Sequence, residues 1–351
     1  MHPFRKLLLI SLGRADSFEK TPTHRDWLLM YGMAKQQTLL GVLYNGIERL
    51  PADQRPPESI YESGKHLVEM IEEIHARHER QVRELEAILG KLGLHGCLLK
   101  GTSLSRLYPV PARRTCGDID IWVKGTHDSI LETFDKAGYG IWGVLYQECK
   151  VDIFEDTIVE VHFHPSKMYN PWHNARLQRW LEENSPIRDD ATLTVPDARF
   201  NAVFCMAHMF RHYLEGGLGL RQMMDYYYIL QVLDPADREP VMQTLDRLGM
   251  GRFTAAMMMS LQFNFGLEDE YLLCPPDRKL GRKLIEDSIS MGNFGVLDKR
   301  NHAKEGEGPV RRFLRKNGRV FSNLKYYPGE VIWSPYARVS QFVWRLFKGY
   351  L

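Results

Sequence analysis

The stretch TCGDIDIWV, residues 115–123, places two aspartates inside what is otherwise the pattern of a buried strand. Alternate side chains of an extended chain point to opposite faces, so the three aliphatic side chains share one face. Asp118, Asp120 and Trp122 share the other, with the two carboxylates roughly 6–7 Å apart. Because like charges so close repel each other, the pattern predicts that a cation lies between them or that water screens them.

A second acidic strand follows in TIVEVHFHP, residues 157–165, where alternation places Glu160, His162 and His164 on one face. If this strand neighbours the first in a sheet, Glu160 completes a cluster with the two aspartates. Three such oxygen donors suit Mg²⁺ or Mn²⁺. A pair of these metals holds an attacking hydroxyl and a leaving phosphate in line.

A phosphate-binding turn is predicted at Lys100-Gly101-Thr102-Ser103, where a short apolar strand turns into a helix. Such a turn offers a cation, a close backbone approach at the glycine, two hydroxyls and free helix N–H groups. Arg114, just before the acidic strand, adds a guanidinium that suits phosphate oxygens.

The stretch LLKGTSLSRLYPVPARRTCGDIDIWV, residues 98–123, resembles the signature of the DNA polymerase β-like nucleotidyltransferase superfamily. More narrowly, it is similar to an uncharacterised bacterial nucleotidyltransferase family marked by Lys-Gly, then Leu and Tyr, then Arg, then Asp-Ile-Asp. The residues in register with that pattern are Lys100, Gly101, Leu104, Tyr108, Arg114, Asp118, Ile119 and Asp120.

Two later blocks extend the resemblance. VEVHFHP resembles the family's later acidic strand, with Glu160 where Asp is usual and His162 two positions on. Glu keeps the charge on a longer arm. The helical stretch at 207–230 resembles the family's downstream block, in which the aligned residues are His208, His212, Leu220, Arg221 and Asp225.

The resemblance implies an α+β fold: a polymerase β-like core, with a mixed sheet of about five strands, flanked by N-terminal and C-terminal helical regions. It implies transfer of a nucleoside monophosphate from an NTP to a hydroxyl acceptor, with pyrophosphate released. Two Mg²⁺ or Mn²⁺ ions would bind Asp118, Asp120 and Glu160, the last also serving the acceptor, and His162 would support these ligands. The triphosphate would bind Lys100, Gly101, Thr102, Ser103 and Arg114. The acceptor stays open.

Four regions are predicted along the chain. Residues 1–92 and 191–291 carry helical spacing of apolar residues, and 93–190 alternates short strands with short helices. Residues 292–351 begin as a loop and become basic and aromatic. From Asp298 onward, 12 Lys or Arg residues face 4 Asp or Glu residues, a net charge of +8 in a chain of +2. That segment suits either a helical cap on the acidic remainder or an anionic surface, nucleic acid or membrane.

Two other function classes fit the same residues. A non-catalytic nucleotide- or partner-binding protein on this fold is favoured by the longer arm of Glu160. A metal-dependent hydrolase would use Glu160, His162 and His164 as a zinc triad. Asp152, on the preceding strand, rivals Glu160 as the third carboxylate.

The helical block has simpler interpretations. His208 and His212 lie one turn apart without the acidic residue of an HExxH motif, which favours packing near the sheet. Arg221 and Asp225 have the spacing of a pair on a helix surface.

Bulk composition bounds the class. The chain has 351 residues, of which 44% are hydrophobic and 26% charged, as in ordinary globular proteins. Five scattered cysteines without CxxC spacing indicate a reducing compartment and no disulfide partner. The apolar run near the N-terminus is short for a signal peptide, and no run of 18 apolar residues occurs. We therefore expect a cytoplasmic protein.

Overall fold

The computed structural model describes residues 2–298, 300, 302 and 306–350. Its centre is a mixed sheet of six strands in the order β3-β4-β5-β2-β1-β6. The strands are β1 (Gly96–Leu99), β2 (Ile119–Val123), β3 (Ile141–Trp142), β4 (Glu148–Val151), β5 (Val159–His162) and β6 (Leu193–Thr194). The predicted α+β class is confirmed, with one more strand than expected, because two-residue β6 pairs in parallel with β1.

The register of the central strands places the acidic residues. The expected pairing of the two acidic strands is confirmed, since β2 and β5 run parallel with Asp120 opposite Glu160 and Trp122 opposite His162. On its other edge β2 runs antiparallel to β1, with Leu99 opposite Asp120. Position 100, where β1 ends, therefore lies beside the aspartates.

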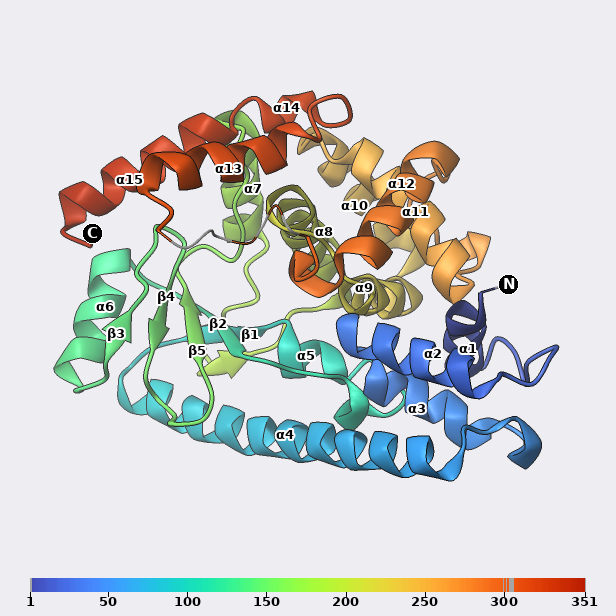
Figure 1. The fold of residues 1–351 in the computed structure, drawn as a ribbon. Helices are drawn as coiled ribbons and strands as arrows, with labels where there is room; N and C mark the ends of the chain where they lie inside the picture. The colour runs from blue at the N-terminus through green and yellow to red at the C-terminus, as the bar shows by residue number, and fades with distance from the viewer. Residues whose placement is uncertain (1, 299, 301, 303–305, 351) are drawn as a thin grey trace.

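Helices cover both faces of the sheet (Figure 1). The face that carries Ile119, Ile121 and Val123 packs against α4 (Glu58–Lys91) and α6 (His127–Lys136) in one apolar core. The opposite face packs against α8 (Ala198–Glu215), and there Trp122 stacks on Phe200 with ring centroids 6.1 Å apart. The acidic residues lie on this second face, between sheet and helices.

The remaining helices of the N-terminal and central regions surround that layer. The N-terminal set is α1 (Pro3–Ser11), α2 (His24–Gln36) and α3 (Leu40–Arg49); α5 (Gly101–Ser105) and α7 (Pro171–Glu183) belong to the strand-bearing region. The central set continues with α9 (Leu220–Val232), α10 (Pro235–Arg247), α11 (Gly251–Phe265) and α12 (Arg278–Met291).

The C-terminal segment is helical: α13 (Pro309–Phe321), α14 (Pro328–Val331) and α15 (Ser334–Lys348). In Figure 1 these helices cross the side of the molecule opposite α4. Val320, Tyr327 and Val331 are buried in the larger apolar core, so the segment is packed onto the body of the protein.

Candidate active site

Three acidic residues and a histidine converge at the ends of β2 and β5. Asp118 directly precedes β2, Asp120 lies within it, and Glu160 is the register partner of Asp120. Ligand atoms of Asp120, Glu160 and His162 all lie within 4.8 Å of one another. Asp118 lines the same cavity of about 270 Å³. Strand pairing thus brings together carboxylates that are some 40 residues apart in sequence.

Asp120 is the centre of the polar contacts. It is 3% exposed, and its Oδ1 lies 2.7 Å from Lys100 Nζ and 2.8 Å from His162 Nε2. Burial favours the neutral acid, but the Lys100 charge and the His162 contact outweigh burial and hold the pKa of Asp120 below its usual range. Asp120 is therefore ionised.

The surroundings of the other two carboxylates disfavour their ionised forms. The charge of Asp120 and then burial raise the pKa of Asp118. Burial and then both aspartates raise the pKa of Glu160, although Lys150 Nζ lies 3.5 Å from its carboxylate. Three acids in one small volume repel one another, and Lys100 offsets only part of that repulsion. A divalent cation among them would offset more.

Lys100 owes its position to an unusual backbone. It has φ +39° and ψ −146°, and Gly101 follows with φ +44°. A positive φ is uncommon for a residue with a side chain and is found mostly where surrounding structure enforces it. The turn follows β1 and directs the Lys100 ammonium to Asp120 on the neighbouring strand β2. Burial lowers the pKa of Lys100, but the charges of Asp120 and Asp118 raise it by more than burial lowers it. The ammonium is therefore charged.

Two histidines of α8 extend the network from above the sheet. His208 Nε2 lies 3.4 Å from Lys100 Nζ and 2.8 Å from His212 Nε2. Burial lowers the pKa of both rings, His212 to about 3 with help from Arg211 and Lys100. Both are neutral at pH 7. Both rings line the cavity, so the prediction that these histidines only pack near the sheet was incomplete. Their place in the family's downstream block was the sequence signal for a position in the site.

Arg114 lies in a different setting from the one predicted. Its side chain is 2% exposed, and Nε and NH2 contact the two oxygens of Asp225 at 2.7 and 2.8 Å. Tyr108 donates a further hydrogen bond of 2.7 Å to the same carboxylate. Arg114 still lines the cavity, but two of its three side-chain nitrogens are engaged in this buried pair.

The predicted surface pair of Arg221 and Asp225 is wrong. α9 is packed inside the protein, so Asp225 faces Arg114 and is 6% exposed. Arg221 instead donates to Thr38 Oγ1 at 3.0 Å and to the Thr115 carbonyl at 3.2 Å. Arg221 also lines the cavity, so it is a cation of the site that the spacing of the sequence alone did not predict.

Two residues of the predicted phosphate turn lie elsewhere. Lys100 and Gly101 line the cavity, whereas Thr102 and Ser103, within α5, are only 3% and 4% exposed and are outside its lining. The predicted contact of their hydroxyls with a triphosphate thus differs from the structure.

The zinc triad is not assembled within the described part of the chain. β5 ends at His162, so the alternation that would bring His164 to the same face stops, and its ring stacks on Tyr146 with centroids 4.9 Å apart. Asp152, the rival carboxylate, accepts a 2.7 Å hydrogen bond from Trp142 Nε1 and is outside the cluster. Glu160 is thus the third acid of the group.

A family model described as an uncharacterised nucleotidyltransferase matches residues 23–266, more than half of the chain. The chain belongs to this family. The match covers every residue of the acidic cluster and both helices that line the cavity above it. No curated protein matches the chain. The nucleotidyltransferase family predicted from the Lys-Gly and Asp-Ile-Asp motifs is confirmed.

Two further findings concern the cysteines and the length of the apolar helices. All five cysteines lie among the described residues and are unpaired, and four of them are buried. Over the same residues, helices long and apolar enough to cross a bilayer are absent.

Proposed function

We propose that the protein transfers a nucleoside monophosphate from an NTP to a hydroxyl acceptor and releases pyrophosphate. The observation that carries this proposal is the juxtaposition of Asp118, Asp120 and Glu160 with the Lys100-Gly101 turn in one cavity, in a chain of a nucleotidyltransferase family. Carboxylates on one side and a phosphate-type turn on the other are what an NTP with divalent metal requires.

The donor set fits Mg²⁺ or Mn²⁺. Hard divalent cations prefer carboxylate oxygens, and such a cation relieves the repulsion among the carboxylates, which raises the pKa of Asp118 and, after burial, that of Glu160. Asp118, Asp120 and Glu160 would hold the metal, which when bound stabilises charge on the transferring phosphoryl group. His162 would orient Asp120 through its 2.8 Å contact.

Other residues of the cavity would bind the triphosphate, position their neighbours and accept the proton. Lys100 and Gly101, at the β1 side of the cluster, would bind the triphosphate, because a metal at Asp120 competes with Lys100 for that carboxylate. Arg221 is a second cation of the cavity, while Arg114 would act through Asp225 as a positioning residue. Glu160, at the β5 side, would accept the proton that leaves the attacking hydroxyl.

One specific contact favours a second candidate. Lys100 Nζ lies 2.7 Å from Asp120 Oδ1 and so occupies a carboxylate that a catalytic metal needs, a contact that a nucleotide-binding protein without transfer chemistry would keep. Incubating the protein with labelled NTPs, Mg²⁺ and a cell lysate separates the two candidates. We expect a labelled acceptor; tight NTP binding without a labelled product would favour the binding protein.

The metal assignment has a direct test in the double variant Asp118→Asn/Asp120→Asn. Because it removes two of three ligands, we expect loss of Mg²⁺-dependent NTP binding by calorimetry, with the circular dichroism spectrum retained. Asp152→Asn is the matched control, an aspartate directly after β4 that lies outside the cluster. Unchanged metal affinity in the double variant would refute the assignment.

A further inference from the structure

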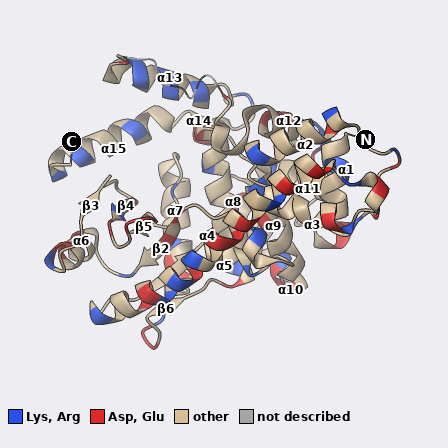
Figure 2. Ribbon diagram, turned by 60° about the horizontal axis from the view of Figure 1, so that its bottom comes forward, with Lys and Arg blue, Asp and Glu red and all other residues tan. Residues whose placement is uncertain are grey.

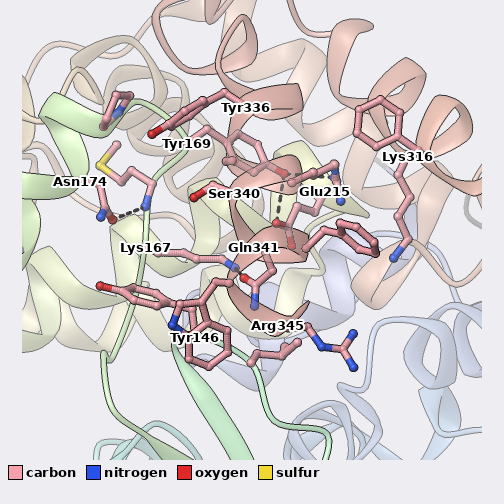
Figure 3. A pocket seen from close by; sticks show the side chains of 18 of the residues that line it. Tyr146, Lys167, Tyr169, Asn174, Glu215, Lys316, Tyr336, Ser340, Gln341 and Arg345 are labelled. Atoms are coloured by element: carbon pink, nitrogen blue, oxygen red, sulfur yellow. Dashed lines mark hydrogen bonds between the residues drawn. The ribbon is translucent and has the colours of Figure 1, made fainter. Parts of the chain in front are cut away.

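A second cavity lies under the C-terminal helices. It has a volume of about 670 Å³ and is lined by α13, α15, the start of α7, the end of α8 and the loops before β4 and after β5 (Figure 3). Cavities of a few hundred Å³ and more commonly hold small molecules. The family match, residues 23–266, includes the side of this cavity formed by α7, α8 and the loops, but not the side formed by α13 and α15, which begins at residue 309.

The charge of this cavity is positive. Of the described residues that line it, five are cationic and one is acidic: Lys167, Arg312, Lys316, Arg338 and Arg345 against Glu215. Glu215 is already engaged, because it accepts a 3.0 Å hydrogen bond from Tyr169 and lies 3.9 Å from Arg211 Nε. Figure 2 shows the accompanying run of Lys and Arg along α13 and α15. The uncompensated charge favours an anionic ligand.

Several donors around this cavity lack acceptors. Within the described part of the chain, Arg338 Nε, Arg345 Nε and the Gln341 amide nitrogen are buried without a hydrogen-bond partner. Leaving buried donors unpaired is costly, and a bound ligand or ion is one way to satisfy them. An anion with several oxygens would supply acceptors to these groups. A phosphate monoester offers three.

The remaining lining is aromatic. Tyr146 and Trp344 meet edge to face at 5.7 Å, and Tyr169 lies under the Arg338 guanidinium at 5.9 Å. The other rings of the lining are Phe313, Tyr336 and Phe342. Flat apolar walls beside a cationic patch fit a ligand with a planar or ring-shaped part next to its charge.

The two cavities share a wall. Glu148 lines the first and Tyr146 the second, two positions apart at the start of β4. On α8, Arg211 lines the first and Glu215 the second, one helical turn apart. In the sheet order, β4 lies on the side of the cluster away from β1 and Lys100. The second cavity therefore adjoins the acidic cluster from the side opposite the phosphate turn.

We infer that this second cavity binds the acceptor, a small molecule that carries a phosphate monoester beside an aromatic or sugar ring. The inference rests on the proposed nucleotidyl transfer. In the step that it serves, the acceptor hydroxyl oxygen bonds to the α-phosphorus while the bond from that phosphorus to the bridging oxygen breaks. Pyrophosphate leaves with the electron pair, and the hydroxyl proton passes to the Glu160 carboxylate.

The test uses phenyl phosphate, which joins the two chemical features and has no hydroxyl to react. Calorimetry on the full chain should show that it binds more tightly than inorganic phosphate or phenol alone. Lys316→Ala/Arg338→Ala removes one cavity cation from each of α13 and α15. We expect its affinity for phenyl phosphate to fall about 100-fold, since two charge-assisted contacts are lost.

The matched control is Arg311→Ala/Lys348→Ala, which removes two cations from the same helices outside the lining. We expect less than about a twofold change there, because exposed charges contribute little. Equal losses in the two double variants, or failure of the intact protein to bind phenyl phosphate, would overturn the inference. Melting temperatures of both variants show whether either result reflects unfolding.

Binding of NTP with Mg²⁺ to the same samples separates the two proposals. NTP binding without phenyl phosphate binding refutes the acceptor cavity and leaves the proposed function intact. Phenyl phosphate binding without NTP binding refutes nucleotidyl transfer and the acceptor role with it. Retained phenyl phosphate binding in Asp118→Asn/Asp120→Asn, with NTP binding lost, is the result expected for two adjoining sites.

Vesicles containing phosphatidic acid test the other source of a phosphate monoester. If they bind and Lys316→Ala/Arg338→Ala abolishes that binding, the phosphate belongs to a lipid headgroup. If only soluble phenyl phosphate depends on these residues, the ligand is a free small molecule. Vesicle binding that both double variants weaken equally would place the lipid contact outside the cavity.

Discussion

The two cavities of this protein are built by different means. The acidic cavity depends on strand register: β2 and β5 hold Asp120 opposite Glu160, and five acids there face four cations. The basic cavity depends on helices laid over loops, and one acid there faces five cations. Hydrogen bonds between paired strands fix the positions of the residues in the acidic cavity. The positions of the residues on α13 and α15 depend instead on how these helices pack against the rest of the protein. The comparison predicts that the two cavities respond differently to the same kinds of change.

The largest expected effect comes from ending the chain after Gly308. This removes the roof of the basic cavity together with Val320, Tyr327 and Val331, which are buried in the larger core. Each buried side chain of this size contributes about 1.5–3 kcal/mol, and the sum approaches the total stability of a typical domain. We expect thermal melting to show loss of cooperative folding.

Phe347→Ser is the control for that truncation, because this ring on α15 is 85% exposed. It should leave the melting temperature unchanged. RNA and vesicle binding of the intact protein and of this variant also address the anionic-surface prediction made for the basic segment. A truncated protein that melts normally but no longer binds RNA or vesicles would show that the segment serves binding and not packing.

An intermediate effect is expected from Lys100→Ala in the acidic cavity. Loss of a charge-assisted contact should weaken Mg²⁺-dependent NTP binding by about 1.5–3 kcal/mol, roughly 10- to 150-fold, measured by calorimetry. Phenyl phosphate affinity should not change, since Lys100 lies outside the basic cavity. Lys124→Ala is the control, an exposed lysine directly after β2 that lies outside the cavity, and it should leave NTP binding nearly unchanged. A loss below about 0.5 kcal/mol for Lys100→Ala would remove it from the triphosphate site.

The smallest effect is a pH dependence of the basic cavity. Burial, and then the charge of Arg211, lowers the pKa of Lys167 to about 8; Glu215, Glu148 and Arg338 also face it. A lowered pKa means that the ammonium is present below pH 8 and lost above it. Phenyl phosphate affinity should therefore fall, by at most about tenfold, between pH 7 and 9.

Lys167→Arg isolates that titration, because a guanidinium stays charged throughout this range. Its phenyl phosphate affinity should be nearly level from pH 7 to 9. Burial also lowers the pKa of Lys316, so the same decline in Lys167→Arg would assign the titration to Lys316 instead.

Local alternation accounts for what the sequence predicted well. Asp118 and Asp120 face away from the aliphatic core because strand geometry leaves them no other side, and Glu160 joins them once β2 and β5 are neighbours. His164 failed the same argument because β5 ends two residues earlier, and strand ends are set by neighbouring strands.

Long-range packing accounts for what could not be predicted. The Arg114–Asp225 pair joins residues 111 positions apart, and the spacing of Arg221 and Asp225 gave no sign that α9 would be buried. Thr102 and Ser103 turned inward because α5 packs on the body of the protein. The basic cavity could not be predicted for the same reason. Residues of α13 and α15 come close to the loops that complete its lining only in the folded protein.

α4 contributes to two apolar cores along its 34 residues, a length of about 50 Å. Ile60 and Val68, near its start, belong to the helical core, while Val82, Leu85 and Leu89, near its end, belong to the core beneath the sheet. Loss of either core would leave half of this helix without apolar contacts, and an isolated half-helix is only marginally stable in water. The helical and strand-bearing halves of the protein are thus thermodynamically linked and should unfold in a single transition.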